Sequence, residues 1–133
     1  MKILMVGKRA PFDGRGAERV LWRIGKKLAH VGHDITIFCP EPVTDTTVPN
    51  VDNISFWFQE TSDGATRSQI EFFVRAPTTY RKVYKTVQPD LVYDNPSPFP
   101  FHMAHFYGDA PVASKVHAIY RRDALACKYH WLV

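Results

Sequence analysis

The sequence predicts an α/β fold that is Rossmann-like, with a mostly parallel sheet flanked by helices. Two observations lead to this prediction. Short apolar runs alternate along the chain with longer amphipathic stretches, which is the pattern of parallel strands joined by helical crossovers. A glycine-bearing loop also connects the first apolar run to the first amphipathic stretch, at 14–18. The length of 133 residues suits a single domain, so one domain is expected over 1–133.

Five strands are expected, each an apolar or β-branched run that a turn residue ends. The run at 2–7 is continuously apolar, which is typical of a strand covered on both faces. The run at 35–39 is rich in β-branched residues and ends at Pro40. Further strands are expected at 54–58, 91–93 and 110–116.

Three helices are expected between and after these strands. The first spans 19–31, with apolar residues on one face and basic residues on the other. The apolar face holds Val20, Ile24, Leu28 and Val31, and the basic face holds Arg19, Arg23, Lys26, Lys27 and His30. Gly32 is expected to cap this helix. A second helix is expected over 67–87, broken or kinked at Pro77, and a third over 121–132.

The composition and net charge of the chain indicate which classes of protein and partner are expected. With 45% apolar and 23% charged residues, the chain is expected to be globular. No apolar run approaches the roughly 20 residues of a membrane span, and the opening segment is too short for a signal peptide, so a cytoplasmic location is expected. The net charge of +4 suits a phosphate-bearing ligand, an anionic membrane face, or solubility alone. It forms no dense stripe interleaved with aromatic residues, so no nucleic acid partner is expected.

The loop after the first expected strand is the first candidate site. It holds Gly14, Arg15, Gly16 and Glu18, directly before the first helix. A helix start offers unpaired N–H groups and the positive end of the helix dipole, which suit an anion, and glycine allows close approach. The spacing matches neither a dinucleotide fingerprint, since Arg19 stands at the third glycine, nor a P-loop. An ordinary turn of an α/β domain is the alternative interpretation.

Three further candidate residues follow later strands. Asp94 and Asn95 come directly after the fourth expected strand, and His117 ends the fifth. Ligands of parallel sheets bind outside the carboxyl ends of the strands, so these residues and the loop at 14–18 are expected at one edge. His102 and His105 are three residues apart, but without further ligands they predict no metal site.

At these residues the chain resembles a known family. The segments at 14–20, Gly-Arg-Gly-Ala-Glu-Arg-Val, and 32–37, Gly-His-Asp-Ile-Thr-Ile, resemble the start of retaining glycosyltransferases of the GT-B fold, in family 4. Those enzymes typically carry Gly-Gly-Ala-Glu-Arg-Val and Gly-His-Glu-Val-Thr-Val. The segment at 89–93 is similar to their Pro-Asp-Val-Val-His strand, and 111–117 to their strand ending in a histidine. The chain departs from the family where Arg15 separates its first two glycines.

The resemblance implies a two-domain enzyme with its active site in the cleft. The N-terminal domain of such enzymes mainly holds the acceptor, and the C-terminal domain holds the nucleotide-sugar through a Glu-x7-Glu motif. These 133 residues resemble the N-terminal domain and contain no such motif, so the domain alone is expected to be inactive. The expected partners are a nucleotide-sugar donor and a sugar or lipid-linked acceptor, with peripheral membrane contact. No cofactor is expected.

The resemblance also suggests residue roles, each with an ordinary alternative. His117 would be the catalytic residue that contacts the transferred sugar or the acceptor, or else a histidine bonded to a backbone carbonyl. Asp94 and Asn95 would bond sugar hydroxyls, or else cap the next turn. Arg15 would meet a phosphate, or else point into solvent. For the whole chain, the alternative is a non-catalytic α/β ligand-binding or regulatory module.

Overall fold

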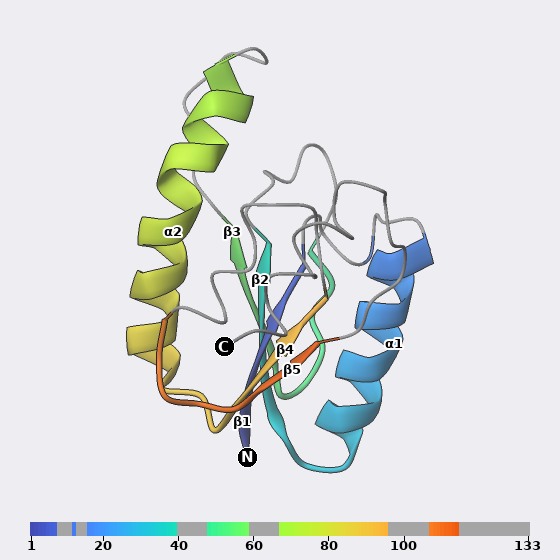
Figure 1. Ribbon diagram of the computed structural model, residues 1–133. Coiled ribbons are helices and arrows are strands. Elements are labelled where there is room, and N and C mark those ends of the chain that lie inside the picture. Colours follow the sequence, from blue (N-terminus) through green and yellow to red (C-terminus); the bar gives the residue numbers. More distant parts are fainter. Residues whose placement is uncertain (8–11, 13–15, 40–47, 59–66, 96–106, 115–133) are drawn as a thin grey trace.

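In the part of the chain that the structure describes, an all-parallel sheet has one helix on each face, which confirms the Rossmann-like α/β prediction (Figure 1). The structure is a computed structural model that describes residues 1–7, 12, 16–39, 48–58, 67–95 and 107–114, with the backbone alone for 67–74. The strands are β1 (Lys2–Val6), β2 (Asp34–Cys39), β3 (Ile54–Phe58), β4 (Leu91–Asp94) and β5 (Val112–Ser114), and the helices are α1 (Gly16–His30) and α2 (Arg67–Val87). The helix expected over 121–132 lies outside the described residues.

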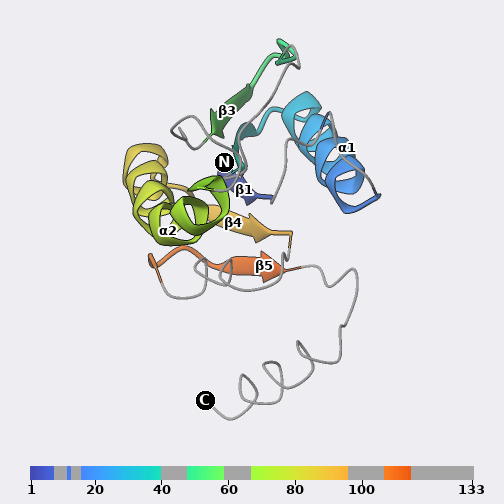
Figure 2. The same cartoon turned by 90° about the horizontal axis from the view of Figure 1, so that it is seen from above.

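The strand order places β1 in the middle of the sheet. Among the described residues the sheet has five strands in the order β3-β2-β1-β4-β5, and every pairing is parallel. The chain runs outward from β1 to β3, then returns through α2 to β4 on the other side of β1. This reversal puts α1 and α2 on opposite faces (Figure 2). The carboxyl ends of β1 and β4 are therefore the topological switch point, where ligands of such sheets bind.

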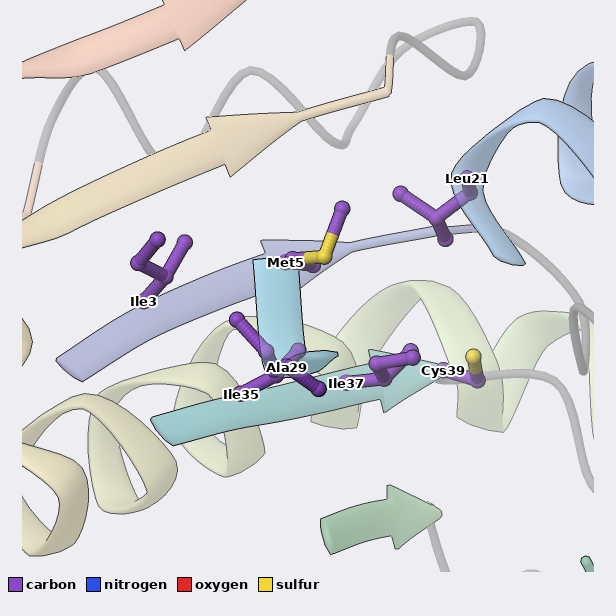
Figure 3. Packing of buried hydrophobic residues seen from close by; sticks show 7 residues of the cluster. All are labelled: Ile3, Met5, Leu21, Ala29, Ile35, Ile37 and Cys39. Atoms are coloured by element: carbon purple, nitrogen blue, oxygen red, sulfur yellow. The ribbon is translucent and has the colours of Figure 1, made fainter. Parts of the chain in front are cut away.

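Alternate residues of each strand enter two separate cores. Ile3 and Met5 of β1 face α1, whereas Leu4 and Val6 face α2. The core under α1 is drawn in Figure 3 and holds Ile3, Met5, Leu21, Ala29, Ile35, Ile37 and Cys39. The core under α2 holds Leu4, Val6, Phe38, Tyr80, Val83 and Val92. Because both faces are covered, strands β1 and β2 have no polar alternation, as their sequences indicate.

Helix α1 buries a face slightly different from the one expected. Its fully buried residues are Leu21, Gly25 and Ala29, and the side chain of Val31 is 67% exposed. The expectation for Val31 is wrong because the helix ends at His30, one residue earlier. The expected glycine cap is confirmed. Gly32 has φ of 89°, its N–H donates to the Ala29 carbonyl (3.0 Å), and the next N–H, of His33, donates to that of Leu28 (3.1 Å).

Helix α2 continues through Pro77, so of the two expectations the break is wrong and the kink stays a prediction. Proline removes one intrahelical hydrogen bond, but Ala76 and Tyr80 on either side of it are buried against the sheet, and their packing holds the helix together. The helix ends after Val87, where Gln88 takes a left-handed φ of 48° and its N–H donates to the carbonyl of Tyr84 (2.8 Å). This turn directs the chain into β4.

The segment before β5 is fastened to α2. The N–H of Ala110 donates to the Tyr84 hydroxyl (2.9 Å), and the Arg81 guanidinium lies 5.1 Å from the centre of the Tyr107 ring. The expected strand at 110–116 therefore begins only at Val112. The N–H of Ala110 donates to the Tyr84 hydroxyl instead of to a neighbouring strand, and Pro111 has no N–H. Residues 115–116 of that expectation lie outside the described part.

Gly108 makes this attachment possible, which gives a stability prediction. Its φ is 100°, and a Cβ at this position would overlap the ring of Tyr84. Gly108→Ala is expected to lower the free energy of unfolding by about 2 kcal/mol or more, since the left-handed backbone alone costs a residue with a Cβ about 1–2 kcal/mol. Urea unfolding of both chains measures the difference.

The matched control adds the same methyl group to a glycine without these constraints. A Cβ on Gly16 would meet no atom of the described part of the chain within 4 Å, and Gly16 is not among the described residues with positive φ. Gly16→Ala should change stability by no more than about 0.5 kcal/mol, the range of unconstrained surface substitutions. Equal destabilisation by the two substitutions would contradict the account of Gly108.

Candidate functional site

The site predicted from sequence lies at the carboxyl edge of the sheet, where three strands end together. The N–H of Gly7, just after β1, donates to the Phe38 carbonyl of β2 (3.0 Å). On the other side of β1, the N–H of Asn95 donates to the Val6 carbonyl (3.0 Å). Helix α1 begins at this same edge and runs back toward the other one (Figure 1). The edge thus combines strand ends with a helix N-terminus.

Asn95 joins the end of β4 to the first turn of α1. Its side chain is only 4% exposed, and its Nδ2 donates to the carbonyl of Ala17 at 3.4 Å. This contact brings two groups of predicted site residues together, the pair Asp94–Asn95 and the first turn at 16–18. This hydrogen bond lies within the domain, and it holds the start of α1 against the end of β4.

The first turn of α1 includes residues that the sequence assigned to a loop. Helix α1 begins at Gly16, so Gly16 and Glu18 are helical, and the expectation of a loop over 16–18 is wrong. Glu18 suits this place because a negative side chain is stabilised by the positive end of the helix dipole. Among the described residues, none reaches the space beside Gly16, and its neighbours Gly14 and Arg15 lie outside the described part of the chain.

Asp94 is a buried carboxylic acid at the end of β4. It pairs with Val6 of β1 and Ser114 of β5, and only 1% of it is exposed. Burial raises its pKa from 3.8 to about 7, because charge is costly away from water. At neutral pH a large fraction of this carboxyl is therefore protonated and can donate a hydrogen bond as well as accept one.

Two tyrosines share the surroundings of Asp94. Burial, then Tyr84 and Asp94, raises the pKa of Tyr80, and burial followed by Asp94 raises the pKa of Tyr93. Both hydroxyls are buried, and neither has a hydrogen-bond partner within the described residues. These three acidic groups can all carry a proton at pH 7, so the interior behind this edge is rich in hydrogen-bond donors.

Sequence reasoning did not single out Tyr80 or Phe12. Tyr80 repeats with Ala76 and Val83 at helical spacing, which predicts a buried face, but its proximity to Asp94 depends on the pairing of the strands. Phe12, in the connection between β1 and α1, has its ring edge-on to Phe56 (5.6 Å between ring centres) and packs on β3. No periodic signal marks an aromatic residue within a loop.

Part of the predicted site stays outside the description. The proposed catalytic His117 lies outside it, as do His102 and His105. Within the described ranges, no group of three or more His, Cys, Asp or Glu side chains could hold a metal ion. Over the same part of the chain, no helix combines the length and apolar character needed to cross a membrane.

Comparison with known proteins agrees with the fold and identifies the family of the chain. The sequence model of the family described as Glycosyltransferase Family 4 matches residues 14–133, which is nearly the whole chain. The chain therefore belongs to this glycosyltransferase family, and it is a glycosyltransferase-type module. A search of curated proteins found no significant match.

The raised pKa of Asp94 predicts a pH-dependent stability. A carboxyl that stays protonated in the folded chain up to about pH 7, but ionises near pH 3.8 when unfolded, binds more protons in the folded state between these values. The free energy of unfolding should therefore fall as pH rises from about 4 to 7, by about 4 kcal/mol at most from this group. Asp94→Asn should remove that part of the dependence.

Urea unfolding at pH 4.5 and pH 7.5 measures this effect. The Asp94→Asn protein should gain stability relative to the parent at pH 7.5 and show little gain at pH 4.5. Asp109→Asn is the control, because it makes the same change at an exposed position. A parent whose stability rises between these pH values by the same amount as that of the Asp94→Asn protein would refute the assignment.

Proposed function

We propose that this chain is the acceptor-binding domain of a retaining glycosyltransferase, which transfers a sugar from a nucleotide-sugar to an acceptor. The single observation that carries the proposal is the family match over residues 14–133. The geometry of the carboxyl edge supports it, because the start of α1, Asp94 and Asn95 lie together at the carboxyl ends of β1 and β4.

The proposed roles follow from the chemistry of each group. Free N–H groups in the first turn of α1 would stabilise anionic charge on the leaving diphosphate, and Gly16 leaves room for its approach. Protonated Asp94 would donate to a sugar hydroxyl once acceptor binding opens a path to it. His117 is proposed as the catalytic residue that contacts the transferred sugar, and Arg15 as a phosphate contact near Gly14 and Glu18.

Transfer is proposed to require a second domain that binds the nucleotide-sugar, because these 133 residues contain no Glu-x7-Glu motif. The enzyme would work in the cytoplasm, on a sugar or lipid-linked acceptor at the inner face of a membrane. The net charge of +4 favours acceptors and surfaces that carry phosphate.

Ligand titration of the isotopically labelled chain tests this proposal. Oligosaccharides and an undecaprenyl-type diphosphate sugar serve as acceptor probes, and UDP-glucose and GDP-mannose as donor probes. Acceptor probes should shift the NMR signals of the amides at 16–18 and of Asn95, whereas donor probes should bind at least 10-fold more weakly. Tight binding of a donor probe with no acceptor binding would overturn the proposal.

Gly16→Ala sharpens the test, because the added methyl group meets no atom of the described residues within 4 Å. Any loss of binding then reports a ligand in that space. We expect binding of the best acceptor probe to weaken about 10-fold, of the order of one lost charge-assisted hydrogen bond. Lys85→Ala, on an exposed part of α2, is the control and should bind normally. Unchanged affinity in the Gly16→Ala protein would remove Gly16 from the site.

A further inference from the structure

The outer face of α1 carries a stripe of positive charge. Arg23, Lys26, Lys27 and His30 are all exposed on this face, away from the sheet, and Glu18 is the one acidic residue in the helix. An amphipathic surface helix ordinarily mixes charges of both signs on its outer face. These four residues lie in the second and later turns, and Arg19 extends the basic face to the first turn at 16–18, which forms the candidate site.

No described carboxylate neutralises these charges. Over the residues that the structure describes, Arg23, Lys26 and Lys27 form no ion pair with a carboxylate. The ammonium group of Lys26 instead lies 5.2 Å from the centre of the Trp22 ring, so its neighbour is an aromatic face. The stripe therefore presents a positive potential to whatever lies outside it.

The surface is hollowed and ends in an apolar residue. A shallow, open depression on this surface is lined by Arg23, Lys26, Lys27, His30 and Val31. Val31 is 67% exposed and follows the basic residues directly. A second depression joins Lys26 and His30 to Asp52 and Asn53, so the carboxylate of Asp52 sits at the side of the stripe.

We propose that this face of α1 docks on a bilayer that contains anionic lipids. Charge complementarity selects the partner, since lysine and arginine at a membrane interface bind acidic headgroups while their stems and nearby aromatic and apolar groups meet the lipid boundary. The basic residues of α1 supply the charges, and Val31, exposed directly after the helix, supplies the apolar contact. A nucleic acid would use the charges but leave the exposed Val31 without a role.

Docking in this way sets the position of the candidate site, a consequence that rests on the proposed function. Ala17 precedes Arg23 by six residues, so the first turn of α1 lies about 9 Å along the helix from the stripe. The carboxyl edge of the sheet would then open sideways, at the level of the headgroups. A lipid-linked acceptor could reach it without leaving the membrane.

Vesicle sedimentation tests the docking. The probes are vesicles of phosphatidylcholine alone and of phosphatidylcholine with 30% phosphatidylglycerol. We expect binding only to the anionic vesicles, weakened by salt. The variant Arg23→Gln/Lys27→Gln should bind about 25-fold more weakly, from about fivefold for each charge near the surface. The control Lys82→Gln/Lys85→Gln makes the same charge change on α2, on the opposite face of the sheet (Figure 2), and should bind almost normally.

Three results would overturn the proposal. One is failure to bind anionic vesicles at low salt, and another is equal loss in the two double variants, which would show an effect of net charge alone. The third is preference for a random-sequence DNA duplex over the vesicles, lost in the α1 variant. Circular dichroism checks that each variant is folded. The vesicle assay involves no sugar, so a failure to bind vesicles would not contradict the proposed acceptor binding. A failure of the acceptor titrations would likewise not contradict the membrane docking.

Discussion

The arrangement of this domain depends on the pairing of β1 with a parallel strand on each side. Leu4 lies between Thr36 of β2 and Val92 of β4, and its side chain is completely buried. With β2 and β4 on either side, the central strand forms a parallel backbone ladder along each of its edges. The same pairing places the carboxyl ends of the two neighbouring strands on either side of the end of β1. The position of the candidate site is a result of this register.

The register of the strands also explains why the end of β4 carries two polar residues, Asp94 and Asn95, that are both buried. Asp94, the last residue of β4, lies two residues after Val92 and therefore on the same face of the sheet. Its side chain enters the core on the side of α2, near Tyr80, whereas the side chain of the next residue, Asn95, reaches α1. Burial raises the pKa of the Asp94 carboxyl, and a hydrogen bond to the Ala17 carbonyl holds the amide of Asn95. Neighbouring residues of one chain thus serve opposite faces of the sheet.

Most of the fold could be predicted from the sequence because its strands and helices appear as distinct apolar runs and amphipathic stretches. The run at 54–58 and the helix at 67–87 have the expected bounds, since hydrophobic periodicity is strongest in such elements. The predictions failed where a single tertiary contact decides the local structure. The Tyr84 hydroxyl takes the N–H of Ala110 and delays β5, and packing beside Pro77 outweighs the cost of a proline in a helix. For the site, sequence spacing predicted the edge but not the proximity of Tyr80 to Asp94. His117, Gly14 and Arg15 remain predictions.

The turns at the amino edge of the sheet differ from the connections at the carboxyl edge in how much change of length they can accept. Only residues 31–33 and 88–90 separate each helix from the strand after it, and Gly32 and Gln88 are held there with positive φ. An inserted residue in either turn would move a strand out of register. The connections at 7–15 and 59–66 are longer and leave the carboxyl edge. Related chains can therefore diverge in length on the side of the candidate site while the frame that holds it stays constant.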